Sequence, residues 1–345
     1  MLYIRTDMNS IIATGHVMRC LAIADAAKIQ GEQTTFILAD EQAVELLANR
    51  GYPYIILHTK WDCMEEELSL LEKIIREYQI RSLLIDSYQV TYSYLKRLSL
   101  HVKTYYMDDL NRFIYPVHGL ICYAINGDTF RYHENYPNTK LYLGTQYTPL
   151  RKEFSGCSEK IIKPEAQNLL LMSGGSDPFG FLAKMLEKLD IRSYRRIDVI
   201  CGVYHTNYQE LRQKYAAFSQ IHIQKSVSDM QNYIDRADLA VSAGGTTLYE
   251  LCAFGTPAIS YTIADNQVGN AEVFQKQGII DYAGDIRNDM GAVIRYMHRQ
   301  LARYRDNSDL RTKRSRKMQK LVDGSGAARI AQALRESGEP PVLRK

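Results

Sequence analysis

Short apolar segments alternate with helical segments along most of the chain, and this alternation restricts the possible folds more than any other feature. In the first part, apolar segments of strand length occur at 2–5, 34–38, 54–57, 82–85, 102–106 and 119–122. Segments of helical character lie between them, at 16–30, 41–49, 62–78 and 91–99. Strands that alternate with helices usually form a parallel sheet that helices cover on both faces. The chain is therefore predicted to be an α/β protein.

The same pattern starts again after a polar stretch at 155–160. The later apolar segments lie at 168–172, 197–201, 221–224, 238–242, 258–261 and 279–282. A chain of 345 residues exceeds the size at which one hydrophobic core usually stops growing, so we expect two domains. We place a Rossmann-like domain at 1–160, a second at 161–335 and a short tail at 336–345. The last helical segments, at 287–305, 308–321 and 326–336, have no strands between them and are expected to pack back across the domain junction.

The composition is that of a globular protein, with 46% hydrophobic and 24% charged residues. The longest apolar runs, such as 169–172, have the length of a strand and not of a membrane span. The amino terminus lacks the basic and apolar regions of a signal peptide. These features predict a cytoplasmic location.

No metal or cofactor site is predicted. The six cysteines are scattered, without a C-x-x-C pair or a histidine at zinc spacing, and are expected to be reduced thiols. Asp108 and Asp109 are adjacent, where a metal-dependent sugar-nucleotide transferase would usually show D-x-D.

Basic residues gather near the carboxyl end, in a run at 311–320. Such a run is most often the solvated face of a helix, and the alternative is peripheral contact with an anionic membrane surface or a partner. The run has no interleaved aromatic residues and no nucleic-acid-binding motif, so we do not expect nucleic acid as a partner.

The first strand leads into a small-residue loop that carries Gly15 and His16. Ligands of open α/β sheets bind at the carboxyl ends of strands, so these two residues lie where chemistry is expected. The positive end of the following helix disfavours a protonated imidazole, which favours a neutral base near pH 7. The alternative is that His16 merely caps or packs against the helix.

Two glycine-rich turns follow strands of the second half. Gly174, Gly175 and Ser176 come after strand 168–172, and the helix beyond them is expected to offer free amides. Gly244, Gly245 and Thr246 come after strand 238–242 and can present N–H groups to a diphosphate, while Glu250 can accept hydrogen bonds from a ribose. Asn266 and Gln267 follow strand 258–261. All of these loops are expected to converge on one edge of the sheet.

Four motifs together resemble the PseG/SpsG family. They are Gly15-His16-x-x-Arg19, Gly144-x-x-Tyr147-x-x-Leu150-Arg151-x-Glu153-Phe154, Ser173-Gly174-Gly175-Ser176-Asp177 and Ser242-Ala243-Gly244-Gly245-Thr246-Thr247-x-x-Glu250. The best-known members of this family are UDP-sugar hydrolases of pseudaminic acid biosynthesis and relatives of the MurG glycosyltransferases. The resemblance implies a GT-B fold, in which two Rossmann-like domains place their parallel sheets on either side of a cleft.

The resemblance also implies roles for individual residues. His16 corresponds to the family's general base, Tyr88 of the segment Leu84-Ile85-Asp86-Ser87-Tyr88 to a substrate contact, and Glu250 to the glutamate that binds the nucleotide. The family loop commonly reads G-x-G-H, whereas Ala13 stands at the first glycine here, and Ser87 replaces a histidine. The expected substrate-binding set is Gly15, Arg19, Asp86, Tyr88, Tyr147, Arg151, Gly174, Gly175, Ser176, Gly244, Gly245, Thr246, Glu250, Asn266 and Gln267.

The expected reaction is hydrolysis of a UDP-sugar without a metal. UDP is a good leaving group that backbone amides can stabilise, and His16 would take the proton of a water that attacks C1 with inversion. Asp7 or Asp86 could orient the other ring nitrogen. Three alternatives stay open: a MurG-like transferase to a lipid or sugar acceptor, a sugar-nucleotide epimerase, and a sugar-nucleotide-binding protein without turnover.

Overall fold

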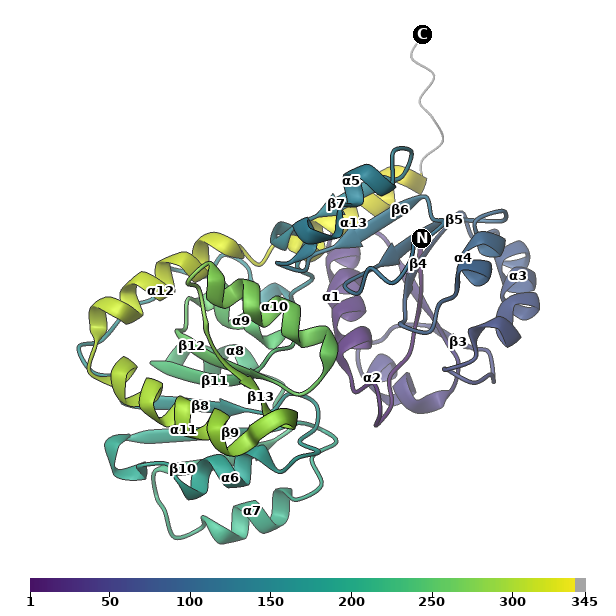
Figure 1. The fold of residues 1–345 in the computed structure, drawn as a ribbon. Helices are drawn as coiled ribbons and strands as arrows, with labels where there is room; N and C mark the ends of the chain where they lie inside the picture. The colour runs from purple at the N-terminus through teal and green to yellow at the C-terminus, as the bar shows by residue number, and fades with distance from the viewer. Residues whose placement is uncertain (339–345) are drawn as a thin grey trace. The chain divides into compact units, whose positions relative to one another are not determined.

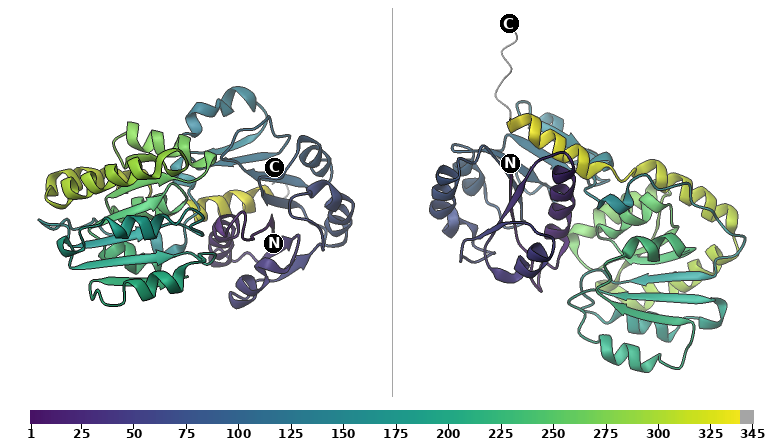
Figure 2. Two further views of the ribbon diagram at one scale, coloured as in Figure 1. Left: turned by 60° about the horizontal axis from the view of Figure 1, so that its bottom comes forward. Right: turned by 180° about the vertical axis from the view of Figure 1, so that it is seen from behind.

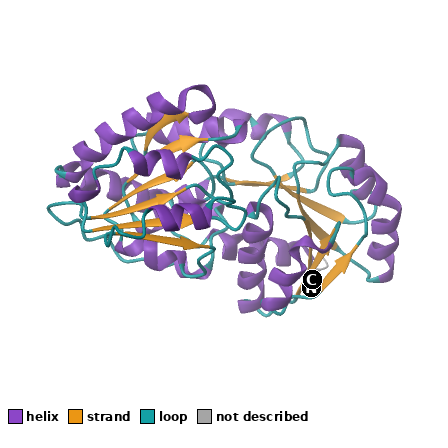
Figure 3. Cartoon of the chain, turned by 90° about the horizontal axis from the view of Figure 1, so that it is seen from below, coloured by secondary structure: helices purple, strands orange, loops and turns teal. Residues whose placement is uncertain are grey.

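A computed structural model describes residues 1–338 of the chain (Figure 1). The chain forms two compact units, one made of residues 1–152 together with the segment from Ser325 onward, and the other made of Glu153–Gly324. Each unit contains one sheet with helices on both of its faces (Figure 3). This confirms the prediction of an α/β protein with two Rossmann-like halves. Most of the predicted tail, residues 339–345, lies outside the described residues.

The sheet of the first unit has seven parallel strands in the order β3-β2-β1-β4-β5-β6-β7. The strands are β1 (Leu2–Thr6), β2 (Thr34–Leu38), β3 (Tyr54–Ile56), β4 (Ser82–Asp86), β5 (Lys103–Met107), β6 (Gly119–Cys122) and β7 (Lys140–Leu143). The helices are α1 (Gly15–Ile29), α2 (Val44–Asn49), α3 (Leu68–Glu77), α4 (Tyr92–Leu98), α5 (Tyr132–Asn135) and α13 (Gly326–Gly338). Short 3-10 helices are η1 (Glu41–Ala43), η2 (Met64–Glu67), η3 (Gly127–Phe130) and η4 (Thr145–Tyr147), and η5 (Lys152–Phe154) lies at the unit boundary.

The sheet of the second unit has six parallel strands in the order β10-β9-β8-β11-β12-β13. The strands are β8 (Asn168–Met172), β9 (Arg196–Cys201), β10 (Ile221–Lys225), β11 (Leu239–Ala243), β12 (Ala258–Thr262) and β13 (Asp281–Asp285). The helices are α6 (Phe181–Glu187), α7 (Tyr208–Lys214), α8 (Met230–Arg236), α9 (Thr247–Phe254), α10 (Asp265–Lys276), α11 (Ile286–Arg305) and α12 (Ser308–Leu321), with the 3-10 helix η6 (Ile191–Ser193).

The predicted strands differ from the observed ones mainly at the sheet edges. β7 was not predicted, because an edge strand with half-exposed side chains has only a short apolar signal. The last predicted strand, 279–282, is shifted to Asp281–Asp285, since the apolar pair Ile279-Ile280 is buried just before the strand begins. The central strands β4 and β8 match their predicted apolar runs closely.

An arginine lies in the core of the first unit and holds two carboxylates. Arg5 of β1 is fully buried, and its Nε and Nη2 donate to the two carboxylate oxygens of Glu67 at 2.8 and 2.7 Å. Its Nη1 is paired with Asp7, whose Oδ1 accepts a hydrogen bond from the Ala39 amide at 2.7 Å. The Tyr94 hydroxyl donates to Glu67 at 2.6 Å. The cluster thereby ties the end of β1 to the loop after β2, to η2 and to α4.

The last helix, α13, packs on the first unit, as expected for a helix that returns across the domain junction, although the expected domain bounds had placed residues up to 335 in the second domain. Its buried side chains recur every three or four residues, at Ala327, Ile330, Ala331 and Leu334, and make one apolar face. That face lies against α1, and Figure 2 shows the helix beside the first sheet from two further sides. An apolar stripe indicates that one face of a helix is buried, but it does not identify the element that buries it. The sequence alone could therefore not assign the packing partner of α13.

The return of the chain to the first unit depends on a glycine. A Cβ at Gly324 would lie 1.8 Å from the carbonyl oxygen of Phe154, where no side chain fits. Part of the motif Gly144 to Phe154 thus packs directly against the returning segment. The observed boundary at 152/153 lies a few residues before the expected one at 160/161.

Candidate functional site

His16 lies at the carboxyl edge of the first sheet, over the end of β4. Thr6 and Asp86 are partners in the register of β1 and β4, so both strands end at the same level. His16 is the second residue of α1, and its Nδ1 lies 2.7 Å from Oδ1 of Asp86. The sequence left Asp7 and Asp86 open as its partner. The structure assigns Asp86, because Asp7 is held by Arg5.

Three further side chains close a ring of contacts with this pair. Arg19, one turn after His16 on α1, donates from Nε to Asp86 Oδ2 at 2.6 Å and from Nη1 to Asp109 Oδ2 at 3.1 Å. The Tyr88 hydroxyl donates to the same Asp109 oxygen at 2.8 Å. The ring of Tyr88 meets the His16 ring edge-on, with 4.5 Å between centroids. Arg19, Asp86 and Tyr88 are thus brought together with His16.

Two members of this site were missed by the sequence analysis. Asp109 follows β5 at its carboxyl end, and the Tyr123 hydroxyl accepts a hydrogen bond from Arg19 Nη1 at 2.8 Å. The signal for Asp109 was present, since it follows a predicted strand as Asp86 does.

The charge of Asp86 determines the tautomer of His16. Burial alone would raise the pKa of the Asp86 carboxyl, but the charge of Arg19 and the hydrogen bonds from Arg19 and His16 hold that pKa well below its usual range. An ionised carboxylate only accepts hydrogen bonds, so Nδ1 of His16 carries the proton that it donates. Nε2 is then an acceptor without a partner in the described chain, in a side chain that is 6% exposed. The site therefore presents an oriented, unprotonated imidazole nitrogen.

The backbone around His16 offers unused hydrogen-bond donors. The first amide of α1 that bonds within the helix is that of Met18, to Thr14, and the Thr14 side chain does not cap the helix. The amides of Gly15, His16 and Val17 have no acceptor in residues 1–338. This helix start can therefore bind an anion or a polar substrate group.

Ala13 adopts a strained conformation in the loop before α1. Its φ is +55°, in the left-handed region that favours glycine. Asn9 shapes this loop by accepting hydrogen bonds from the amides of Ile11 and Ile12 at 2.8 and 2.9 Å. The departure from the family's G-x-G-H pattern thus falls where the backbone needs a glycine conformation. Ser87, the other departure, accepts a hydrogen bond from the Gln89 amide at 3.1 Å.

In the second unit, the three predicted polar loops share one edge. β8, β11 and β12 are neighbouring parallel strands, and Ser242 is paired with both Met172 and Ser260. The loops that follow these strands therefore begin at the same level. This is the arrangement that the sequence predicted for the candidate diphosphate site.

The donors in the loop after β8 differ from those expected. The amides of Gly174, Gly175 and Ser176 have no acceptor in the described chain, as the prediction required. At the start of the helix beyond them, Asp177 accepts hydrogen bonds from the amides of Phe181 and Leu182 at 2.8 and 2.9 Å, so these two amides are used within the fold. An acidic side chain near a helix start competes with any bound anion.

The free amides in the loop after β11 also differ from those predicted. The Gly244 amide donates to Tyr261 at 2.7 Å, which extends the ladder between β11 and β12, and the Gly245 amide donates to Ala243 at 2.9 Å. Neither amide is available to a ligand, contrary to expectation. The amides of Thr246 and Thr247 have no acceptor in residues 1–338, and Thr246 makes no side-chain cap of α9. The free donors therefore begin one residue later than predicted, with Thr247 missed.

The remaining predicted residues of the second unit lie on helix starts. Glu250 is half-buried in the first turn of α9, and Asn266 is exposed in the first turn of α10. Gln267 Oε1 accepts a hydrogen bond from the Ile263 amide at 3.0 Å, so this side chain closes its own loop.

Tyr147 and Arg151 are not part of the His16 cluster. Tyr147 follows β7 and packs on Tyr142, with 5.7 Å between ring centroids. β7 is the edge strand, three strands away from β4 in the sheet. Arg151 lies just before the unit boundary.

The basic run on α12 is largely used within the fold. Arg311 is buried and donates to the carbonyls of Tyr304 and Pro164 at 2.8 and 2.7 Å. Arg314 is paired with Asp281, and Lys317 donates to the carbonyl of Gln277 at 2.7 Å. Lys313, Arg316 and Lys320 are exposed, and Arg316 among them is paired with Glu159 at 3.4 Å.

No metal site or membrane span is found in the part of the chain that the structure describes. No cluster of three or more His, Cys, Asp or Glu side chains in residues 1–338 is arranged to hold a metal ion. No helix there is long and apolar enough to cross a membrane. The six cysteines are free thiols.

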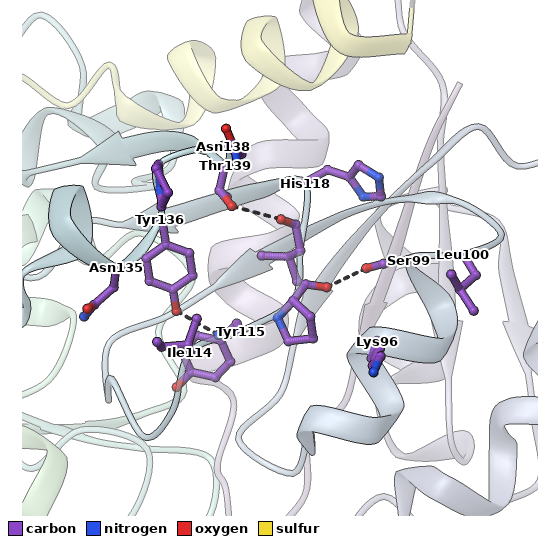
Figure 4. Close-up of a pocket in the computed structure, with 13 residues that line it drawn as sticks. Lys96, Ser99, Leu100, Ile114, Tyr115, His118, Asn135, Tyr136, Asn138 and Thr139 are labelled. Carbon is purple, nitrogen blue, oxygen red and sulfur yellow. Dashed lines mark hydrogen bonds between the residues drawn. The ribbon is translucent and has the colours of Figure 1, made fainter.

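A cavity of about 400 Å³ lies elsewhere on the first unit (Figure 4). Its lining includes His118 and Thr139, which directly precede β6 and β7, and Lys96 from α4. It therefore opens at the amino ends of these strands, the edge opposite to His16. None of the predicted site residues lines it.

Comparisons with known proteins give a consistent result. Residues 169–323 match the glycosyltransferase family 28 C-terminal domain. The chain is 25% identical over 337 residues to the spore coat polysaccharide biosynthesis protein SpsG of Bacillus subtilis (strain 168), with 95% of this chain and 96% of SpsG covered.

Two solved structures share the fold. MurG of Acinetobacter baumannii has a TM-score of 0.67 and 14% identity, with 97% of this chain and 100% of MurG covered. A glycosyltransferase from Rickettsia africae ESF-5 has a TM-score of 0.62 and 14% identity, with 97% and 98% covered. These findings confirm the GT-B fold and the predicted resemblance.

Proposed function

Because this chain is an SpsG-like protein with the glycosyltransferase-like GT-B fold, we propose that it is a UDP-sugar hydrolase. The proposed products are UDP and a free amino sugar of the 2,4-diacetamido-2,4,6-trideoxyhexose class. Such a sugar would serve pseudaminic acid or a related surface or spore coat polysaccharide.

The oriented imidazole of His16 is the observation that carries this proposal. Its Nδ1 donates to Asp86 at 2.7 Å, and Nε2 is left as an acceptor without a partner in the described chain. A neutral imidazole held in this way can take a proton from a water molecule. A transferase needs a base as well, but it must also exclude water from the sugar carbon.

The proposed step is a direct displacement at C1 of the sugar. The water oxygen forms the new bond to C1 while His16 Nε2 accepts the water proton. The electrons of the breaking C1–O bond go to the β-phosphate oxygen of UDP. The free amides at Gly174 to Ser176 and at Thr246 and Thr247 support this proposal, because they can stabilise the diphosphate charge without a metal. Glu250 is proposed to accept hydrogen bonds from the ribose.

The test is incubation with UDP-2,4-diacetamido-2,4,6-trideoxyaltrose in labelled water without an acceptor. Proton NMR in the first minutes should show the inverted anomer, and mass spectrometry should place the label on the sugar. His16→Asn should lower kcat roughly a hundredfold with UDP affinity little changed, because a general base contributes on that scale. Label on UDP, or a retained anomer, would exclude displacement at C1 by water.

A MurG-like transferase is the second candidate, supported by the family 28 match at residues 169–323. It would bind the same UDP-sugar and replace water with an acceptor hydroxyl. Absence of turnover until a lipid or sugar acceptor is added would favour it over the hydrolase.

Peripheral contact with an anionic membrane is a separate proposal, supported by the exposed side chains of Lys313, Arg316 and Lys320. Cosedimentation with anionic vesicles should be lost in Lys313→Glu/Lys320→Glu. Absence of vesicle binding by the unaltered protein would leave these residues as a solvated helix face.

A further inference from the structure

Asp109 is a second carboxylate beside His16, with no role so far. It comes from the loop after β5, and its Oδ2 accepts hydrogen bonds from Arg19 and from the Tyr88 hydroxyl. The side chain is 13% exposed. Its other oxygen, Oδ1, is buried and has no hydrogen-bond partner among residues 1–338. A buried carboxylate oxygen without a hydrogen-bond partner lowers the stability of the fold. Packing alone therefore does not explain why an ionisable side chain stands at this position.

The charges of the cluster do not balance while His16 is neutral. Asp86 and Asp109 carry two negative charges, and Arg19 carries the single positive charge among the side chains in the ring. Cys20 lies beside Asp86, but burial and that carboxylate raise the pKa of its thiol, so it stays neutral.

The neighbours of the ring do not restore the balance. Tyr88 and Tyr123 act as hydroxyl donors or acceptors and are neutral near pH 7. Arg112 lies on the outer side, 6.0 Å from the centroid of the Tyr88 ring, and donates to the Tyr88 carbonyl. Asp108 faces away and is held by the Tyr115 and Tyr132 hydroxyls. The ring therefore has a net charge of about minus one, which a proton on His16 would cancel.

We propose that Asp109 is a positioning residue that makes this ring complementary to the protonated form of His16. It acts through two neighbours: it accepts a hydrogen bond from Nη1 of Arg19, whose Nε and Nη2 both bind Asp86, and it holds Tyr88 edge-on against the His16 ring. The first contact places a second negative charge beside the guanidinium that shares Asp86 with His16, and the second fixes the plane of the ring. The proposal rests on the proposed function, in which His16 becomes protonated as water attacks.

The perturbation is Asp109→Asn, which keeps the shape of the side chain and an oxygen acceptor but removes the charge. Without that charge the imidazolium is less stable, so the acid limb of the pH–rate profile should move to lower pH by about half a unit to one unit. kcat should fall about tenfold while KM changes little, because the lost stabilisation belongs to the transition state. Asp109→Glu, which retains the charge, should recover most of the pH profile.

Asp25→Asn is the matched control. Asp25 lies on the same helix as His16, but it is paired with Arg50 at the surface, where its side chain is 34% exposed. The variant changes the net charge by the same amount and should leave the pH profile unchanged. If Asp109→Asn does not fold, Asp109→Ser serves as the second neutral variant, with folding checked by Trp61 fluorescence.

A measurement without substrate separates this proposal from the proposed function. NMR titration of the His16 ring, assigned by its loss in His16→Asn, should show a lower pH midpoint in Asp109→Asn than in the unaltered protein. An unchanged midpoint would overturn the role of Asp109 even if the chain hydrolyses UDP-sugars. A lowered midpoint in a chain without hydrolase activity would support that role and count against the proposed reaction alone.

Discussion

Replacing Arg5 with methionine should destabilise the first unit strongly. Arg5 is fully buried and is the counter-charge of two carboxylates, Glu67 and Asp7, which are themselves nearly inaccessible. Removing one partner of a buried ion pair typically costs about 3–5 kcal/mol, and here two carboxylates lose their partner. Methionine fills a similar volume, so a cavity adds little. We therefore expect a loss of about 4–5 kcal/mol at pH 7.

The loss should depend on pH, with a sign that follows from Asp7. Burial raises the pKa of the Asp7 carboxyl even with Arg5 present, and without Arg5 this pKa should rise further. A carboxyl whose pKa is raised in the folded state stabilises the fold at low pH and loses this contribution as pH rises through that pKa. The deficit of Arg5→Met relative to the unaltered protein should thus be smaller at pH 5 than at pH 8.

The assay is urea unfolding followed by the fluorescence of Trp61, the only tryptophan. Trp61 lies just before η2, in the same unit as Arg5. The matched control is Arg97→Met, which removes a bidentate pair with Glu72 in the same unit, but with Arg97 47% exposed. That control should cost much less than Arg5→Met, because water screens an exposed ion pair. An equally small loss for Arg5→Met, or a deficit that is the same at pH 5 and pH 8, would refute the reasoning.

Four further results are expected. Ala13→Gly should raise the free energy of unfolding by about 0.5–1 kcal/mol, because φ is +55° there, and a lower stability in urea unfolding would contradict the strain. Asp86→Asn should lower kcat by about 10²- to 10⁴-fold in steady-state kinetics by favouring the wrong tautomer of the histidine, and near-normal kcat would remove it from the site. Gly202→Ala should destabilise the second unit by about 1–3 kcal/mol, because a Cβ there would lie 2.2 Å from the Gly174 carbonyl oxygen. The same change should weaken UDP binding in calorimetry, whereas the control Gly291→Ala on α11 should leave the affinity for UDP unchanged. EDTA should not reduce turnover, and inhibition reversed by Mg²⁺ would show a metal requirement.

The sequence predicted the sheets best where strands are buried on both faces. The runs at 82–85 and 168–172 are continuous and apolar, because helices cover both sides of those central strands. β7 has half-exposed side chains at a sheet edge, so its pattern is too weak to stand out. The partner of α13 could not be predicted either, because an amphipathic pattern does not specify which surface covers it.

The candidate site was predicted in its location more than in its contacts. His16 and Asp86 were expected close together because each follows the carboxyl end of a strand, whereas Arg19 was expected in the site from the motif that resembles the PseG/SpsG family. Which carboxylate orients His16 depended on Arg5, whose burial beside Asp7 no local pattern shows. In the glycine-rich turns, the residue types indicated that a ligand could approach the backbone closely. They did not show which amides already bond within the fold, as the Gly244 amide does.

The discontinuous first unit has a consequence for synthesis on the ribosome. Residues 1–152 emerge first, yet the helix that covers α1 emerges only after the whole second unit. More than 170 further residues are therefore synthesised before α13 can cover the apolar surface of α1. The second unit is contiguous and can complete its fold in the meantime. Native structure in the first unit should thus be finished last, and an early stop before α13 should leave a nascent chain that depends on chaperones.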